Sequence, residues 1–534
     1  MRKDEIPGVI AGAKLIIFPG QKGHGGPPPV DPPKDGGDLN RRLATFARTD
    51  LGNSERFQER FRGQLLHCQA LGWLAWDGRR WSSSLGLERV EEAEQETVRA
   101  IRLEADAIEG TRDDYEIEDA KGKKVLLSEA LRKHGRASEA RSRVRAISDL
   151  ASCRMSAQVS EFDRDPMRFN VENGTLVFRR GDEGVCVDLL PHNPADMITK
   201  VAPVVFDPEA RCDAFNRFLE EVQPEETMRR FLAQWCGYSL TGNTSEQKLC
   251  FFYGKGNNGK SVFVETFRYI AGDYGDELPI ESFLDAGRAR IGGQATPDLA
   301  ELPGVRCLTT TESEKGAKLA EALVKQITGG DRVKARHLNR DYFSFMPQLK
   351  LTAMGNYRPE VRGTDEGIWR RIILVPWGVT IPKERRDLSL SEKLRAEASG
   401  ILNLFLAGLK DWLEKGLLVP QSALDATAQY REDSDPLGRF LAACTEPAIG
   451  ERVASTDMHH LYCVWAKANG ERAWTPTGFG KAMRDRGIPN AKSSVVYWVD
   501  VRLTKCASDF QDHQADTPPA DESSYGATYG RDDD

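Results

Sequence analysis

The period of the apolar positions changes several times along the 534 residues and predicts a mixture of helices and strands. An alternation of apolar and polar residues around turn residues predicts β-hairpins at 71–81 and 169–190. Stretches with a helical period predict helices at 87–109, 128–162 and 208–243. The first part of the chain is therefore expected to combine helices with small antiparallel sheets.

Short apolar runs dominate the middle of the chain, and polar side chains stand at their ends. Residues 249–253, 305–312 and 349–356 each predict a buried strand. A fourth strand is predicted within 369–375, directly after two arginines. Residues 262–271 predict an amphipathic helix between the first two strands.

The last third of the chain predicts helices, a boundary and a further small domain. Residues 390–432 have a helical pattern, and Asp435-Pro436 marks a boundary after them. The elements expected beyond it are a helix at 456–468, a turn at 474–478, a helix at 478–486 and a strand at 497–503. This order is typical of a winged-helix domain.

Composition changes this picture mainly at the two ends. Residues 1–38 hold seven Pro and eight Gly, and such a stretch buries too little apolar surface to offset its ordering entropy. We expect a disordered arm there and a disordered acidic tail at 507–534. No apolar stretch approaches the ~20 residues of a membrane span, so no membrane partner is expected.

The net charge of −7 does not exclude a nucleic-acid partner. Residues 507–534 hold eight acids and one Arg, so the other 506 residues sum to zero. Residues 451–506 hold nine bases and five acids, which permits contact with duplex or forked DNA. The ten cysteines form no Cys-x-x-Cys pair, and a reducing cytoplasm is the expected setting.

Two features of the first part admit two interpretations each. Trp73, Trp76 and Trp81 fit a hydrophobic core better than a base-stacking platform, because large aromatics usually fill cores. Six bases between 132 and 145 fit a solvated helical face as well as a phosphate contact.

The stretch Gly254–Ser261, GKGNNGKS, fits the phosphate-binding pattern G-x-x-x-x-G-K-[ST] between a predicted strand and a predicted helix. Backbone N–H groups of such a loop and the helix N-terminus bind polyphosphate. Lys260 would reach the β and γ phosphates, and Ser261 would supply a hydroxyl to Mg²⁺. The residues expected to hold the nucleotide are Gly254, Gly256, Asn257, Asn258, Gly259, Lys260 and Ser261.

Three later residues stand where ATP hydrolysis needs them. Glu312 ends a predicted strand and would hold Mg²⁺ or polarise water, with Glu314 as a nearby alternative. Asn356 ends another strand, where an amide would contact the γ-phosphate or the water; a turn Asn is the alternative. Arg371, or else Arg370, would stabilise transition-state charge in a neighbouring subunit.

A basic hairpin is predicted between the strands that end at Glu312 and Asn356. Residues 331–340 carry four bases, one acid and a His, and aromatic residues follow them. Interleaved bases and aromatics favour contact with single-stranded nucleic acid over a merely solvated hairpin. Lys334, Arg336 and His337 are the expected contacts.

Together these motifs resemble the superfamily 3 helicases of viruses and mobile elements. The segments QKLCFFYGKGNNGKSVF, EALVKQITGGDRVKARHL and MGNYRPEVRGTDEGIWRRI are similar to phage and plasmid primase-helicases, the group related to the poxvirus primase-helicase. The resemblance is strong across 249–376 and looser outside it.

The resemblance implies roles for the site residues. Lys260 and Ser261 match the Walker A lysine and Mg²⁺ ligand, Glu312 the Walker B acid, Asn356 the sensor asparagine and Arg371 the trans arginine. Several family members have two adjacent Walker B acids, whereas Thr311-Glu312 supplies one. Lys334, Arg336 and His337 fall in the segment that faces the central channel.

The expected fold is multidomain α/β, with an AAA+-type P-loop ATPase core, an α+β N-terminal domain and a C-terminal winged-helix domain. The expected divisions are the arm 1–38, the N-terminal domain 39–205, a helical collar 206–247, the ATPase core 248–380, a helical bundle 381–434, the winged-helix domain 435–506 and the tail 507–534.

The expected function is ATP-dependent DNA unwinding in phage or plasmid replication by a hexameric ring that translocates on single-stranded or forked DNA. The alternative is a nucleotide-gated platform that encircles DNA without processive unwinding. Only about 38 linker-like residues precede the first globular part, so primer synthesis is expected from a separate primase rather than from this chain. Other replication proteins are possible partners, in the cytoplasm of a bacterial host.

Overall fold

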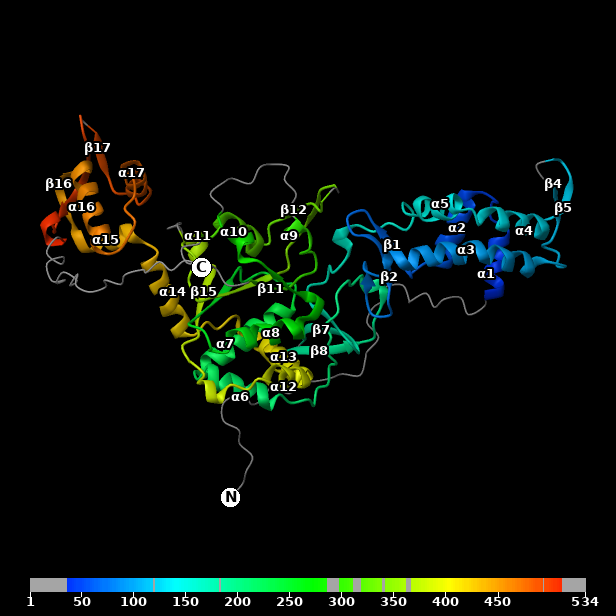
Figure 1. Ribbon diagram of the computed structural model, residues 1–534, viewed down its shortest axis with the longest axis horizontal. Helices are drawn as coiled ribbons and strands as arrows, with labels where there is room; N and C mark the ends of the chain where they lie inside the picture. The colour runs from blue at the N-terminus through cyan, green and yellow to red at the C-terminus, as the bar shows by residue number, and fades with distance from the viewer. Residues whose placement is uncertain are drawn as a thin grey trace, which may run out of the picture. The chain divides into compact units, whose positions relative to one another are not determined.

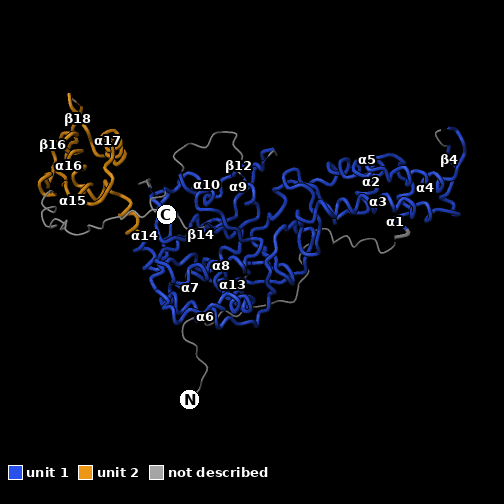
Figure 2. Tube along the Cα trace, viewed as in Figure 1, with its two compact units in different colours: residues 1–427 blue, residues 428–534 orange. Residues whose placement is uncertain are grey.

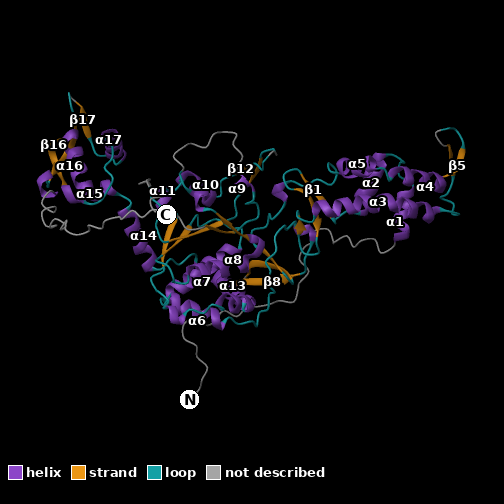
Figure 3. Cartoon of the chain, in the orientation of Figure 1, coloured by secondary structure: helices purple, strands orange, loops and turns teal. Residues whose placement is uncertain are grey.

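The computed structural model describes residues 36–118, 121–181, 184–285, 297–310, 318–338, 341–361, 366–492 and 494–510. The chain divides into two units, residues 1–427 and 428–534, which are coloured separately in Figure 2. Figure 3 shows that the part of the first unit with α1–α5 is mostly helical and that the rest of the unit combines helices with strands.

The N-terminal part of the first unit is a helical bundle with a small sheet at one end (Figure 1). Buried Arg56 and Glu104, joined at 2.8 Å, link helices α2 and α3 inside the bundle. The helices are α1 (Gly36–Ala44), α2 (Asp50–Arg60), α3 (Gly86–Ile108), α4 (Leu127–Ser138) and α5 (Arg141–Ala151). The antiparallel strands are β1 (Leu65–Cys68), β2 (Gly72–Trp76) and β3 (Trp81–Ser82), with β4 (Glu116–Glu118) and β5 (Lys124–Leu126) as a separate pair.

Three expectations for this part are refined. The helix expected at 128–162 is two helices that are separated at 139–140 and end at Ala151, with a 3-10 turn at Val159–Glu161. Trp81 is 2% exposed and donates to the Pro194 carbonyl, so its indole is structural. Helix α1 begins inside the arm expected at 1–38; residues 1–35 lie outside the described part.

A second antiparallel sheet connects the bundle to the core of the unit. The strands β6 (Arg168–Val171), β7 (Gly174–Gly181) and β8 (Gly184–Leu190) confirm the hairpins expected at 169–190. The helices α6 (Asp213–Val222) and α7 (Glu226–Leu240) follow, as the pattern at 208–243 predicts. A 3-10 turn occupies Pro194–Asp196 between sheet and helices.

The core is a five-stranded parallel sheet in the order β10-β11-β14-β9-β15. Its strands are β9 (Leu249–Tyr253), β10 (Gly275–Leu278), β11 (Cys307–Thr310), β14 (Lys350–Gly355) and β15 (Ile372–Pro376). Strands β9, β11, β14 and β15 are almost entirely buried, which explains why they read as continuous apolar runs.

Helices pack against this sheet and share one hydrophobic core with it. Helix α8 (Lys260–Ala271) follows β9, and α13 (Ala398–Lys415) packs against α7. Gly237 and Gly408 permit that close approach. An added Cβ at Gly237 would lie 2.2 Å from the Phe405 carbonyl oxygen, and one at Gly408 would lie 2.0 Å from the Ala233 carbonyl oxygen. The remaining elements are 3-10 turns at Gly272–Tyr274, Ile280–Phe283 and Lys383–Arg385, helices α9 (Pro297–Ala300), α10 (Glu321–Gly329), α11 (Glu366–Trp369), α12 (Leu390–Ala396) and α14 (Gln421–Asp433), and strands β12 (Val333–Ala335) and β13 (Phe343–Phe345).

The second unit has its own hydrophobic core and an antiparallel sheet in the order β16-β18-β17. Its elements are α15 (Pro436–Cys444), β16 (Thr445–Ala454), α16 (Ser455–Ala468), α17 (Pro476–Asp485), β17 (Asn490–Lys492) and β18 (Val496–Leu503). The turn expected at 474–478 is instead the start of α17, where Thr475 caps Gly478 and Pro476 occupies the first turn. Residues 507–510, expected in the tail, form a 3-10 turn whose Phe510 packs on this core.

Among the described residues, no helix is both long and apolar enough to cross a bilayer.

Candidate functional site

The loop Gly254–Ser261 leaves the buried strand β9 and enters helix α8, as its sequence predicts. Gly259 and Asn257 adopt left-handed backbone conformations, with φ of 83° and 62°. Gly259 also packs on α6, where an added Cβ would lie 2.7 Å from Val222. Gly254 is equally constrained, because its Cβ would meet the Trp377 carbonyl oxygen at 2.2 Å. The glycines therefore fix the path of this loop.

Lys260 begins helix α8 and is 3% exposed. Its ammonium Nζ donates to the Gly254 carbonyl oxygen and lies 3.3 Å from Oδ1 of Asn356. Asn356 directly follows β14, which pairs with β9. The structure thus brings together two predicted site residues that lie 96 positions apart.

Asn258 is 3% exposed and stabilises the loop through two hydrogen bonds. Its amide donates to the Trp377 carbonyl oxygen at 3.1 Å, and its Oδ1 accepts from the Lys260 backbone N–H at 3.3 Å. The Asn257 carbonyl accepts from the backbone N–H of Ile381 at 2.8 Å. The segment after β15 therefore holds the loop in place, a support that the sequence pattern did not predict.

The loop fits a polyanion. An added Cβ at Gly256 would meet nothing within 4 Å, so the middle of the loop faces open space. The buried Lys260 ammonium contacts the neutral oxygens of Gly254 and Asn356, and phosphate oxygens are stronger acceptors than either. Ser261 is exposed in the first turn of α8, where a hydroxyl can ligate a cation. Among the described residues, no group of three or more His, Cys, Asp or Glu side chains is arranged to hold a metal.

The predicted Walker B acid Glu312, and its alternative Glu314, lie outside the described residues. Strand β11 is described as far as Thr310. It pairs with β14 in parallel, so its carboxyl end lies at the same edge of the sheet as Asn356.

Arg371 lies at the opposite edge of the sheet from Lys260. It precedes β15, and its carbonyl accepts from the N–H of Leu249, the first residue of β9. Five residues at about 3.3 Å each separate that edge from the loop. The Arg371 side chain is 8% exposed and donates to the Gly367 carbonyl at 2.5 Å and to Gln247 Oε1 at 3.5 Å, whereas Arg370 is exposed.

The basic hairpin is formed by β12 and β13, with Lys334 opposite Ser344. The Lys334 ammonium and the Arg336 guanidinium lie 4.7 and 4.8 Å from the ring centroid of Tyr342. His337 stacks on Phe343 at 5.7 Å. The three residues predicted to contact nucleic acid therefore share one aromatic-lined hairpin.

Sequence reasoning missed Arg358, which lies at the carboxyl edge of the parallel sheet. Its guanidinium lies 5.2 Å from the ring centroid of Tyr253, the last residue of β9 before the loop. The only signal was its position two residues after Asn356, inside Asn-Tyr-Arg-Pro.

Two family models match separate regions of this chain. Residues 54–224 match the family model described as D5 N terminal like, and residues 432–490 match the one described as Poxvirus D5 protein-like. These matches confirm the resemblance to the D5-related primase-helicases. The candidate nucleotide site lies between the two matched regions.

Curated viral relatives of this chain are named as helicase or primase candidates. The chain is 26% identical over 335 residues to a candidate helicase of Acanthamoeba polyphaga mimivirus, covering 58% of this chain and 34% of that protein. It is 25% identical over 271 residues to a candidate helicase of Frog virus 3, covering 47% of this chain and 28% of that protein. A candidate primase of African swine fever virus is 25% identical over 41% of this chain and 23% of its own length. The chain thus spans about a third or less of the length of these relatives.

Among solved structures, the apo NrS-1 C-terminal region is similar at 13% identity and a TM-score of 0.37. That likeness covers 60% of this chain and 82% of that one. A TM-score of this size does not establish a common fold.

Proposed function

We propose that the chain is an ATP-dependent DNA helicase subunit of superfamily 3, with ATP and Mg²⁺ as cofactors. The observation that carries this proposal is the contact between Lys260 and Asn356 at the carboxyl edge of the parallel sheet. A glycine loop, a buried lysine and an amide at one sheet edge are the parts that bind and sense a γ-phosphate in P-loop ATPases. The helicase names of the viral relatives support DNA as the substrate.

The strand order supports an AAA+-type core. Strand β14 directly precedes Asn356 and lies between β9, which precedes the phosphate loop, and β11, which precedes Glu312. All three carboxyl ends therefore converge on one edge, where ligands bind in open parallel sheets.

In the proposed ATP hydrolysis, each side chain of the site has a separate role. Lys260 would exchange its neutral oxygen partners for phosphate oxygens, and Asn356 would orient the attacking water through its amide. Ser261 and Glu312 would hold Mg²⁺, which neutralises charge on the phosphates when bound. Glu312 would also polarise the water.

We propose a ring of subunits, with six as the expected number, because Arg371 is too far from its own loop to complete that site. An arginine at the far edge of the sheet would act on nucleotide bound to a neighbour. In such a ring, Lys334, Arg336 and His337 would face single-stranded DNA in the channel. A separate primase would supply primers.

The second unit would be a winged-helix domain that contacts duplex or forked DNA. Its order of helix, strand, two helices and two strands supports this fold. Lys481 and Arg484 on α17 and Lys492 on β17 are exposed, and none of the three forms an ion pair with a described residue. These cations would contact phosphates.

The deciding measurement is ATP hydrolysis by the full chain with and without single-stranded DNA. Lys260→Ala is expected to lower turnover by about 100-fold or more, because it removes a preorganised cation from the phosphate site. Lys255→Ala is the matched control, since Lys255 is exposed in the same loop.

Equal activity of wild type and Lys260→Ala would refute the proposal. Unwinding of a forked duplex distinguishes a helicase from the encircling platform. ATP hydrolysis and DNA binding without strand separation would favour the platform.

A further inference from the structure

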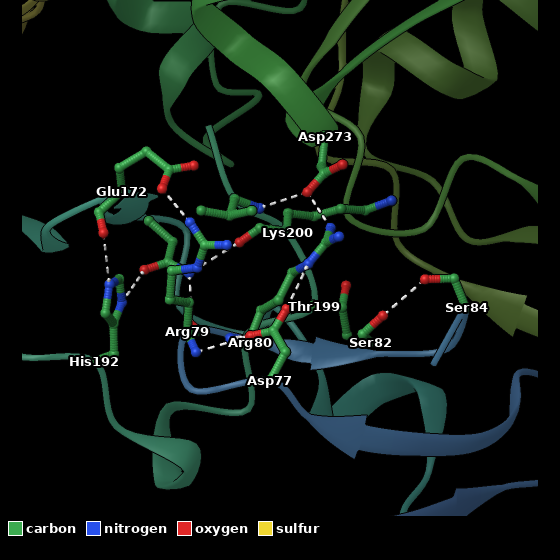
Figure 4. A network of polar contacts seen from close by, with 12 residues as sticks. Asp77, Arg79, Arg80, Ser82, Ser84, Glu172, His192, Thr199, Lys200 and Asp273 are labelled. Atoms are coloured by element: carbon green, nitrogen blue, oxygen red, sulfur yellow. Dashed lines mark hydrogen bonds and ion pairs between the residues drawn. The ribbon is translucent and has the colours of Figure 1, made fainter. Parts of the chain in front are cut away.

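The small sheet β1-β2-β3 of the N-terminal part contacts the core of the first unit at two functional places. One contact is made by the turn between β2 and β3, shown in Figure 4. There Arg80 forms an ion pair with Asp273 through Nη1, while its Nε lies 3.4 Å from Asp77 within the same turn. The Arg80 side chain is 24% exposed and extends from the turn to Asp273 in the core of the unit.

Asp273 lies in the 3-10 turn Gly272–Tyr274 that follows helix α8, the helix that begins with Lys260. The same carboxylate oxygen that Arg80 contacts also accepts from the backbone N–H of Val201 at 2.9 Å. The preceding Gly272 packs so closely on this segment that an added Cβ would lie 2.2 Å from Pro203. The carboxyl end of α8 is therefore clamped between the turn and residues 201–203.

Tyr274 extends this clamp to the central sheet. Its hydroxyl accepts from the Asn170 N–H at 3.1 Å, and its carbonyl accepts from the Arg306 N–H at 2.8 Å. The Arg306 guanidinium lies 4.6 Å from the Tyr274 ring centroid. Because Arg306 immediately precedes β11, a displacement at the clamp reaches both α8 and the strand that leads to Glu312.

The other contact of the small sheet is with the basic hairpin. Gln69, after β1, donates to Asp341 at 3.5 Å. A groove of about 1030 Å³ lies between the small sheet and the basic hairpin. It is lined on one side by His67–Ala70, 152–153 and 156–161, and on the other by Arg336 and Tyr342. The sheet thus adjoins both the hairpin proposed to hold DNA and the helix proposed to hold nucleotide.

We propose that this sheet links the basic hairpin to the phosphate-loop helix, with Arg80 as the positioning residue. Single-stranded DNA at the hairpin would shift the sheet through the Gln69 side, and the Arg80–Asp273 pair would pass the shift to α8. Helix α8 is continuous from Lys260 to Ala271 and about 18 Å long, so a displacement at Asp273 would be transmitted along it to Lys260. This inference rests on the proposed function.

The same turn offers a matched control. Arg79 is adjacent to Arg80, but its side chain pairs with Glu172 on the β6–β8 side rather than with Asp273 (Figure 4). Its carbonyl accepts from Asn170 at 2.9 Å, a contact that a side-chain substitution leaves intact. Arg79→Ala therefore removes an arginine from the turn without releasing the helix.

The test compares stimulation of ATP hydrolysis by single-stranded DNA in full-length variants. Arg80→Ala and Asp273→Asn are expected to reduce the stimulation by about threefold or more while the rate without DNA stays within about twofold. The double variant is expected to be no worse than either single one, because both remove the same contact. Arg80→Lys should recover part of the stimulation, and Arg79→Ala should keep it.

Three outcomes would overturn the link: unchanged stimulation in Arg80→Ala, an equal loss in Arg79→Ala, or a fall in the DNA-free rate with the stimulation ratio preserved. The last would mean that Arg80 only supports the fold. If wild type hydrolyses ATP but is not stimulated by DNA, the proposed helicase function fails and the link fails with it. If wild type is stimulated and Arg80→Ala behaves identically, only the link is wrong.

Discussion

At the residue scale, the proposed chemistry rests on Lys260 and Asn356. A buried ammonium is costly unless it is hydrogen-bonded, and Lys260 contacts the neutral oxygens of Gly254 and Asn356. Phosphate oxygens carry charge and therefore bind an ammonium more strongly than these two oxygens do. In the proposed nucleotide site, phosphate oxygens would therefore be stronger acceptors for the Lys260 ammonium than these two oxygens are.

The substitution Asn356→Asp tests the proposed role of Lys260, because it places a negative charge beside the Lys260 ammonium. A carboxylate beside Lys260 would neutralise it and repel phosphates, so nucleotide affinity is expected to fall by about tenfold or more. Asn356→Ser adds no charge, so it should retain affinity but lower turnover. Fluorescent ATP-analogue titration measures the affinity, and equal affinities for the two variants would contradict this interpretation.

At the scale of the element, the proposed contact with DNA depends on the basic hairpin. Tyr342 holds Lys334 and Arg336 against one ring, so both cations are presented together. Leu338, after His337, is 69% exposed and adds an apolar surface near the turn. Positive charge next to aromatic and apolar surface is suited to binding single-stranded DNA, because both the phosphates and the bases of such DNA are accessible.

Replacing Lys334 and Arg336 together with Ala should weaken binding of single-stranded DNA and flatten its salt dependence. Each lost phosphate contact is expected to reduce the slope of log affinity against log salt by about 0.7. Arg385→Ala is the control, because Arg385 pairs with Glu221 outside the hairpin. Fluorescence anisotropy at several salt concentrations measures the slope, and an unchanged slope would rule out phosphate contacts by the hairpin.

In the second unit, the sequence pattern predicted only some of the elements. The helix α15 and the strands β16 and β17 were not expected, although α16 and β18 were. Strand β16 is largely exposed and interrupted by a register shift between Pro447 and Arg452, so it lacks the apolar alternation of a strand.

At the scale of the whole molecule, the proposed ring depends on the position of Arg371. Its side chain is buried beside Gln247, at the sheet edge opposite the phosphate loop. In the proposed site, a nucleotide bound at the loop would therefore not be contacted by Arg371 of the same chain. Exposed Arg370 is the alternative for reaching a neighbour.

Mixing inactive subunits tests the shared site. Combined Lys260→Ala and Arg371→Ala proteins are expected to recover some ATP hydrolysis, because some interfaces would then pair an intact loop with an intact arginine. The same mixture with Arg370→Ala in place of Arg371→Ala identifies which arginine acts. Absence of recovery at every mixing ratio for both arginines would contradict action in trans.

The sequence by itself determined the parts with local signatures. The glycine loop followed from spacing, the buried strands from apolar runs, and the strand-end Asn356 from its place in such a run. These signals are local because glycine conformation, burial and strand termination each act over a few residues.

Only the tertiary structure decided which of these parts meet. Strand order brings Asn356 to Lys260 and sets Arg371 at the far edge, while Arg80 reaches Asp273 across 193 positions. No periodicity records such pairings, since they depend on how strands are ordered and how sheets dock. The physical reason is that long-range contacts are selected by the packing of the whole core, whereas the sequence pattern reports only the local environment of each residue.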